Sequence, residues 1–562
     1  MPSSLCIVYV CAQDYIAGSV LSIHHVDTDP FQKFVSRLTG GRFRPRCRQT
    51  VTNQIEDRFR ECQQQLKDLL AKLDYVCTTA DCWTSRRRSF LGITVHWLDP
   101  VSLERKGCCL AVRQLLGRHT YDVLAKALES VNNEFQIGDK TCYTVTDSGS
   151  NFLKTFRHFG LDESDVEDFS LSRSSETLST EADHNDLMFH EINDLLVPSS
   201  VSGDVPDDDE QVTYRLPSHL KCAAHLLNLV ASADTAKLEG ALKRISVQTF
   251  AKLTGLWNLQ NRSPIASEKI KNALGVLLVT PGATRWNSVY DSVAKIQGII
   301  SVHEQEVKFD KLCDDLIKTR LLPAQKTFIS EYVRVMAPVA CGLDVLQGEK
   351  AVTFGYLVPT LLIIKSRLLE LMSGTNLTVC QPLASLLLNA IDRRFAHVLC
   401  DAKAKLATVV SPQFKLDWTD SAIEKEELTN VLKTAVLNLH SQESQVASTQ
   451  SSSSDGVEPS AESKGDFFAG LTAKRQRKTA IPNPCVAEVD NYLADPSNEL
   501  SSLYKYPQIM KLYIKLNTGL PASAAVERLF SLGGRVFSPL RANMTSEHFE
   551  MLVFLRAFER GL

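Results

Sequence analysis

The sequence lacks long hydrophobic runs and paired cysteines. No apolar stretch reaches about 18 residues, the length of a membrane-spanning helix, and the richest one, 355–364, is interrupted by Pro359. The fifteen cysteines include no Cys-x-x-Cys pair, which excludes a zinc finger built on that motif and favours reduced thiols. Residues 1–21 have no basic segment before their short apolar stretch and form a poor secretory signal. These absences predict an intracellular protein.

Charge is distributed unevenly along the chain. Its 562 residues are 44% hydrophobic and 23% charged, as in proteins that fold into several domains. Residues 161–210 contain sixteen Asp or Glu and one Arg, so a local charge of −15 within a net charge of −3 leaves +12 elsewhere. A basic body with an acidic segment is typical of polyanion-binding proteins, and ordinary surface charge is the alternative.

Changes in composition and periodicity divide the chain into units. In order, these are a poorly defined N-terminus (1–30), a small helical leading domain (31–73), the first part of an α/β domain (74–160), an acidic loop (161–216), a helix (217–235), a helical domain (236–440), a Ser-rich linker (441–480) and a helical C-terminal region (486–562). The linker ends in a basic cluster, either a nuclear-import signal or a phosphate-binding patch, made of Lys474, Arg475, Arg477 and Lys478.

The α/β unit has a recognisable order of elements. Apolar and β-branched residues predict three strands joined by short loops, at 75–79, 90–98 and 108–115. A helix at 121–135, a strand at 141–146 and a helix at 151–159 are expected to follow. This succession is typical of a mixed sheet of the ribonuclease-H type, in which the strand after the helix lies beside the first strand.

Three acidic residues stand where such a sheet would bring them together. We expect Asp81 to end the first strand, Asp147 to end the fourth, and Glu527 to lie on a helix that begins behind Pro521 with Ser523 as its N-cap. Three carboxylates at one sheet edge can hold two Mg²⁺ or Mn²⁺ ions for phosphodiester cleavage. Turn chemistry at strand ends and a solvated helix face are the alternatives.

Several segments resemble motifs of the hAT transposase superfamily, and they occur in the same order. The matching segments are TADCWTSR (79–86), FLGITVHWLD (90–99), TDSGSNF (146–152), CAAHLLNL (222–229), TRWNS (284–288) and PASAAVERLFS (521–531). The chain resembles in particular the vertebrate descendants of this superfamily that carry BED-type zinc fingers. The resemblance runs from about Phe31 to the C-terminus.

The resemblance implies a ribonuclease-H-like catalytic domain interrupted by a large all-helical insertion, with a helical C-terminal dimerisation region. It assigns the acidic triad to Asp81, Asp147 and Glu527, which in the family bind metal ions for cut-and-paste transposition through DNA hairpins. The implied cofactor of an active enzyme is Mg²⁺ or Mn²⁺. The implied partners are DNA and further copies of the chain, as a homodimer or higher homo-oligomer, with no membrane and no small-molecule substrate.

The resemblance also implies residues that contact DNA. The Arg-Trp motif of the family matches Arg285 and Trp286, and its Trp stacks near a base displaced at the hairpin. An aromatic face stabilises an unstacked base by about 1–3 kcal/mol. Trp83, two residues beyond Asp81, is a second stacking candidate. Packing in a hydrophobic core is the alternative for both tryptophans.

The Cys-x-x-His motif of the family matches Cys222 and His225. At i, i+3 on a helix these residues share one face, but two ligands are too few for a structural zinc site. The family motif implies that His225 contacts the scissile phosphate or the acidic cluster. A histidine satisfied by helix packing is the alternative.

The chain departs from the family pattern before Phe31. These transposases normally start with a BED finger, a Cys-x-x-Cys followed by a His pair, and no such motif precedes Phe31. We therefore expect impaired recognition of specific DNA ends. We also expect the acidic segment 161–210 to repel DNA unless it moves away or binds a metal ion or a basic partner. Two hypotheses follow: a nuclear hAT-type transposase or close descendant, and a domesticated, non-catalytic nuclear protein that acts in chromatin or transcription.

Overall fold

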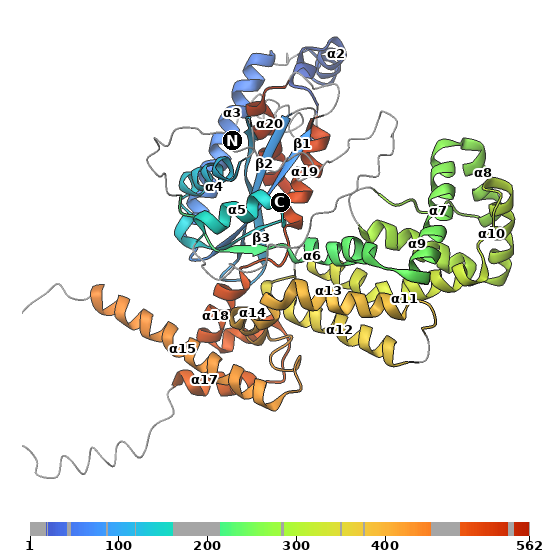
Figure 1. The fold of residues 1–562 in the computed structure, drawn as a ribbon. Coiled ribbons are helices and arrows are strands. Elements are labelled where there is room, and N and C mark those ends of the chain that lie inside the picture. The colour runs from blue at the N-terminus through green and yellow to red at the C-terminus, as the bar shows by residue number, and fades with distance from the viewer. Residues whose placement is uncertain are drawn as a thin grey trace, which may run out of the picture.

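The computed structural model combines one β-sheet with two groups of helices (Figure 1). The sheet and the helices that cover it come from both ends of the sequence, whereas the helical arm comes from the middle. The described residues are 18, 21–41, 47–85, 88–117, 120–160, 214–282, 286–348, 351–374, 377–450, 484–537 and 544–560.

Five strands form a mixed sheet in the order β3-β2-β1-β4-β5. They are β1 (Val76–Ser85), β2 (Arg88–Leu98), β3 (Arg105–Leu115), β4 (Thr141–Thr146) and β5 (His219–Lys221). The β1–β2 and β2–β3 pairs are antiparallel, and the β1–β4 and β4–β5 pairs are parallel. The strand after the first helix of the sheet region therefore lies beside β1, which confirms the expected mixed topology. This order is consistent with a ribonuclease-H-like core.

Helices flank the sheet and fill the middle of the chain. Those that precede or cover the sheet are η1 (Ile23–Asp27), α2 (Asp29–Leu38), α3 (Arg48–Ala71), α4 (Tyr121–Phe135), η2 (Gly138–Lys140), α5 (Ser150–Phe159), α19 (Ala524–Val536) and α20 (Ser546–Arg560). The helical arm and the chain that returns from it contain α6 (Ala223–Leu229), η4 (Val230–Asp234), η5 (Thr235–Lys237), α7 (Gly240–Arg262), α8 (Pro264–Leu274), α9 (Trp286–Ile300), α10 (His303–Leu316), α11 (Pro323–Leu346), η6 (Phe354–Tyr356), α12 (Leu357–Ser373), α13 (Gln381–Cys400), α14 (Ala402–Val409), α15 (Ala422–Gln450), α17 (Pro484–Ala494), η7 (Leu500–Lys505) and α18 (Pro507–Asn517). None of the helices described is both long and apolar enough to cross a membrane.

The fifth strand differs from the sequence prediction. Residues 217–235 were expected to form one helix, but His219–Lys221 pair in parallel with β4, and α6 begins only at Ala223. Three residues are too few to display a two-residue period beside the helical pattern that follows them. The prediction of a single helix over 217–235 is therefore wrong at its start.

Two further boundaries lie beyond their predicted positions. β1 continues to Ser85, because β2 pairs with it along its whole second half, so Asp81 lies inside the strand and not at its end. α15 continues to Gln450, past the expected start of the Ser-rich linker at 441. Serine and glutamine lower helix propensity only slightly, so a helix can extend into such a sequence.

The C-terminal helices complete the sheet region. α19 packs on β1 and β2, while α20 packs on β3 and α3. In Figure 1 the red C-terminal helices accordingly lie beside the blue strands of the N-terminal half. The apolar residues of α20 are at most 3% exposed and belong to the core of this region: Phe549, Leu552, Val553 and Leu555. The sheet region therefore needs chain segments separated by the whole helical arm.

Arg105 fastens the sheet to the returning chain. Its guanidinium donates hydrogen bonds to the carbonyl oxygens of Val352 at 3.1 Å, Asn517 at 2.6 Å, Thr518 at 2.9 Å and Gly519 at 3.2 Å. Burial lowers the pKa of Arg105 to about 10. One cation from β3 thus satisfies carbonyls at the end of α18 and in the segment before η6.

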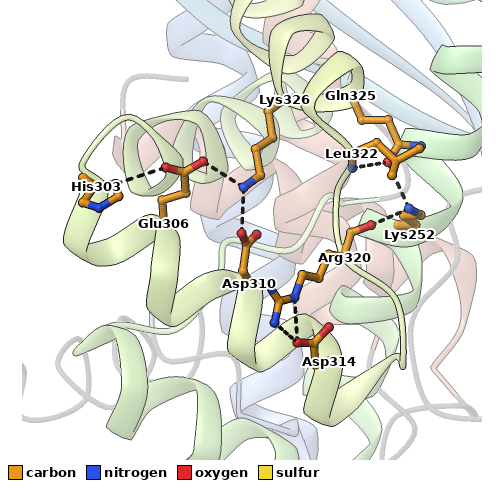
Figure 2. Close-up of polar contacts among 9 residues, drawn as sticks. All are labelled: Lys252, His303, Glu306, Asp310, Asp314, Arg320, Leu322, Gln325 and Lys326. Atoms are coloured by element: carbon orange, nitrogen blue, oxygen red, sulfur yellow. Dashed lines mark hydrogen bonds and ion pairs between the residues drawn. The ribbon is translucent and has the colours of Figure 1, made fainter.

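A polar network fixes the outer part of the helical arm (Figure 2). The Lys326 ammonium of α11 lies 2.8 Å from both Glu306 and Asp310 of α10. Lys252 of α7 donates to the Gln325 side chain at 3.0 Å and to the Arg320 carbonyl at 2.5 Å. These bonds join α7, α10 and α11, so the charged groups in this network serve packing between helices.

Candidate functional site

Three different elements present the candidate carboxylates. Asp81 lies in β1, Asp147 follows the last residue of β4, and Glu527 lies in the first turn of α19. All three side chains are half-buried. Ser523 occupies the predicted N-cap position of α19, although its side chain makes no capping hydrogen bond.

Asp81 and Asp147 lie near each other, because β1 and β4 are neighbouring parallel strands. The Cys82 thiol lies close enough to both carboxylates to be affected by their charges. Burial raises the pKa of Cys82 well above its usual range, and the negative charges of Asp81 and Asp147 raise it further. Each carboxylate also accepts a local backbone hydrogen bond, Asp81 from Cys82 N at 2.7 Å and Asp147 from Gly149 N at 3.1 Å.

Gly92 allows α19 to approach β1 beside Asp81. Gly92 is the register partner of Asp81, so the two residues face the same side of the sheet. A Cβ atom at Gly92 would lie 2.5 Å from the Phe530 ring and 3.0 Å from a Val526 methyl group. Helix α19 therefore crosses the sheet at the level of Asp81, and Glu527 follows Val526 in its sequence.

The carboxylates match the ligand chemistry of Mg²⁺ or Mn²⁺ but do not form a complete ligand group. Asp81 and Asp147 offer hard oxygen donors, which suit such ions, and both lie near the Cys82 thiol. Among the described residues, however, no three His, Cys, Asp or Glu side chains come close enough to hold a metal ion. The structure brings the three elements together without gathering Glu527 into a ligand group with both aspartates.

Cys222 joins α6 to the start of α19. Its Sγ accepts hydrogen bonds from His225 N at 3.4 Å and from Ser523 N at 3.3 Å. Burial raises the pKa of this thiol to about 11, and the charge of Glu527 contributes to the rise. Cys222 is 1% exposed and therefore acts as an N-cap and a packing group, while His225 remains half-buried on the same helix.

Trp286 opens α9 and, like Trp83, belongs to a hydrophobic core, with 8% exposure. Its ring centroid lies 5.8 Å from that of Tyr290, and its backbone N–H donates to Asn228 Oδ1 at 3.1 Å. Sequence reasoning overlooked Asn228. It lies three residues beyond His225 within the quoted CAAHLLNL segment, and that spacing could have indicated it.

Trp83 belongs to the hydrophobic core. It is 3% exposed, and its ring centroid lies 4.9 Å from that of Phe90, 4.6 Å from Phe530 and 5.7 Å from Phe549. Of the two alternatives for this residue, the structure favours packing over base stacking, because side chains at i and i+2 of β1 both face α19.

Several predicted features lie outside the described residues. These are Arg285, the acidic segment 161–210, and the basic cluster of Lys474, Arg475, Arg477 and Lys478. The N-terminal residues before 18 are outside as well. Their functions stay predictions from sequence.

Comparison with known proteins supports the resemblance over part of the chain. No protein-family model matches it. Two maize (Zea mays) proteins, described as an AC transposase and an AC9 transposase, are each 25% identical to it over 277 residues. The match covers 47% of this chain but 28% and 27% of the maize proteins, so the chain spans less than a third of their length. The chain is thus distantly similar to hAT-type transposases over about half its length.

Proposed function

We propose that the chain is a hAT-type DNA transposase or a domesticated descendant that binds DNA in the nucleus and retains metal-dependent strand cleavage. The placement of Asp81 and Asp147 at neighbouring positions, in β1 and directly after its parallel partner β4, carries this proposal. The ordered sequence motifs, the mixed sheet and the similarity to the maize transposases support it. The DNA strand is the substrate, and hydrolysis or transfer of a phosphodiester is the reaction.

In this proposal the carboxylates of Asp81, Asp147 and Glu527 hold Mg²⁺ or Mn²⁺. The ions would activate a nucleophile and stabilise the leaving oxygen of the phosphodiester. His225, which lies on α6, would contact the phosphate of the DNA. Arg285 and Trp286 would hold a displaced base. The basic cluster Lys474, Arg475, Arg477 and Lys478 would direct nuclear import.

Dimerisation through the C-terminal region is part of the proposal. Phe549, Leu552, Val553 and Leu555 of α20 are already buried within the chain, so in this proposal they do not form the contact surface between copies. We therefore assign self-association to other surfaces of residues 486–562. A deletion after Ser538 would remove α20 and unfold the sheet region, so surface variants are the cleaner test of self-association.

The second candidate is a catalytically inactive, host-adapted nuclear protein that regulates chromatin or transcription through DNA binding and self-association. One observation favours it: Glu527 is not gathered with both aspartates into a group that could hold a metal ion. The two candidates differ in DNA cleavage and share DNA binding.

The deciding experiment is Mn²⁺-dependent cleavage of the DNA that flanks the gene of this chain. Wild type, Asp81→Asn and Glu527→Gln would be compared, with binding to the same DNA measured at two salt concentrations. The proposal predicts cleavage by wild type alone and equal binding by all three. Equal cleavage by Asp81→Asn would remove this residue from the site. Salt-sensitive binding without cleavage by any protein would favour the host-adapted candidate.

A further inference from the structure

Helix α6 connects the sheet to the helical arm through its two ends. Cys222 is its N-cap, and His225 and Asn228 lie at i, i+3 spacing, so these two share one side of the helix. At one end, Cys222 Sγ accepts from Ser523 N at the start of the helix that carries Glu527. At the other end, Asn228 Oδ1 accepts from Trp286 N at the start of α9.

Both ends of α6 are fixed to their surroundings. Before the helix, Cys222 N donates to the Thr146 carbonyl and Ala223 N to the Pro521 carbonyl, each at 2.8 Å. After it, a π-helical turn ends at Asp234, which is 1% exposed. The Asp234 carboxylate accepts from Arg393 at 2.6 Å and from Arg394 at 2.5 Å. A side chain on α6 is therefore presented from a rigid element.

The first N–H group of α9 has no acceptor within its own helix, as at every helix start. Asn228 supplies that acceptor from α6. Ser288, in the first turn of α9, also bonds to Gly282: its Oγ accepts from Gly282 N and donates to Gly282 O, each at 3.0 Å. Asn287 Nδ2 donates to Asp344 Oδ1 of α11 at 2.8 Å. Among these bonds, the one from Trp286 N to Asn228 Oδ1 links Trp286 to α6, the helix that carries His225.

We infer that Asn228 is a positioning residue, which caps α9 from α6 and fixes Trp286 relative to His225 and the sheet carboxylates. This inference rests on the proposed function, because it matters for DNA only if Trp286 contacts a displaced base. The capping itself is a property of the free protein and can be measured without DNA.

The first arm of the test is hydrogen exchange, read by mass spectrometry, in peptides that cover 281–290 of the full chain. Asn228→Ala removes the acceptor, whereas Asn228→Asp keeps it. Loss of a helix cap is worth about 1 kcal/mol, so the Ala variant should exchange about fivefold faster at the start of α9. Asn228→Asp should exchange as wild type does, and so should the control Asn272→Ala, at an exposed position of α8.

The second arm uses a DNA hairpin with 2-aminopurine at its tip and follows quenching of this base on binding. Wild type and Asn228→Asp should quench it, and Asn228→Ala should quench about fivefold less at equal bound fraction. Unchanged exchange in Asn228→Ala, or exchange in Asn228→Asp as fast as in the Ala variant, overturns the inference. Faster exchange with undiminished quenching overturns it too, provided that Trp286→Ala abolishes the signal. If Trp286→Ala quenches like wild type, the proposed DNA contact fails, and the exchange arm alone decides whether Asn228 fixes α9.

Discussion

The buried carboxylates of the helical arm differ from those of the sheet. Asp234 and Glu331 are 1% and 3% exposed. Burial raises the pKa of Asp234, but hydrogen bonds and the charges of the neighbouring cations outweigh it and lower the pKa overall. Glu331 accepts four hydrogen bonds, from Thr378 N, Thr378 Oγ1, Val379 N and Cys380 N, at 2.7 to 2.9 Å. The structure of the arm accounts fully for both residues.

The sheet carboxylates differ from these in exposure and in placement. Asp81, Asp147 and Glu527 stay half-buried and lie on three elements that the fold brings to one place. A role in packing or ion pairing does not require acids from such distant parts of the chain. Burial alone therefore does not identify a functional acid, because Asp234 and Glu331, which are among the most buried acids of the described residues, serve packing. Exposure, and the placement of the sheet acids on three separate elements, distinguish the two groups.

The largest expected effect is the loss of DNA cleavage when a sheet carboxylate is replaced. Asp147→Asn should lower metal-dependent DNA cleavage more than about 100-fold, since even the partners of metal ligands are worth about 10–100-fold. Its stability should change by less than about 1 kcal/mol, because the side chain is half-buried. Cleavage and urea unfolding would be measured on the same preparation. A variant that cleaves normally but unfolds early would place Asp147 with the structural acids.

The reverse result is expected for Asp234→Ala. Removing this carboxylate leaves Arg393, Arg394 and Lys237 without their shared partner. Arg393 and Lys237 are more than half exposed, so water compensates part of the loss, and the cost should lie at the lower end of the range for a buried pair, about 3 kcal/mol. The midpoint of urea unfolding should fall accordingly, while cleavage measured well below that midpoint persists. An unchanged midpoint would show that Asp234 does not hold the arm.

Arg105→Met tests how much the bonds of Arg105 stabilise the junction between the sheet and the returning chain. The substitution leaves carbonyl groups of Val352 and of residues 517–519 without their donor, which should cost about 3 kcal/mol. Arg105→Lys, which keeps the charge, should recover part of this loss. Thermal unfolding of the three proteins measures it, and equal melting temperatures would contradict the proposed role of this guanidinium.

The smallest effect concerns two histidines of the sheet, His96, which is buried, and His219, which is half-buried. Burial lowers the pKa of both His96 and His219 from 6.5 to about 3. Between these values the unfolded chain binds more protons than the folded one, so stability is full above pH 6.5 and decreases as the pH falls toward 3. At pH 5 the loss is up to about 2 kcal/mol for each histidine.

His219→Gln measures this contribution against wild type. Urea unfolding at pH 7 and pH 5 should give a smaller decrease for the variant, since glutamine does not titrate. The difference isolates the histidine from acids such as Asp99, whose pKa of about 2 produces a decrease at lower pH. Identical decreases in the two proteins would contradict the neutral state of His219.

Much of the sheet region could be predicted from local sequence. The predicted helix 121–135 and strand 141–146 coincide with α4 and β4, because each has a clear period and defined ends. The strand β5 and the extension of β1 depend on pairing with distant segments. No local pattern in His219–Lys221 indicates its neighbour β4. These differences follow from tertiary pairing that overrides local preference.

The residue types of the candidate site could be predicted from the sequence, but the contacts between its side chains could not. The motif spacing indicated Asp81, Asp147 and Glu527, whereas the cap that Asn228 provides for Trp286 joins residues separated by 58 positions. Trp83 lies beside Asp81 in sequence, but its ring packs against Phe530 from the far end of the chain. Only the fold decides which side chains near a motif face the site.

The most direct test of the account is Mn²⁺ binding by the full chain, followed by electron paramagnetic resonance. Wild type, Asp81→Asn and Glu527→Gln would be titrated beside Glu547→Gln, an exposed control in the first turn of α20. If the three carboxylates share one centre, Asp81→Asn and Glu527→Gln each weaken binding at least about tenfold, while the control binds as wild type does. Wild-type affinity in Glu527→Gln would contradict a common centre of the two aspartates and this glutamate.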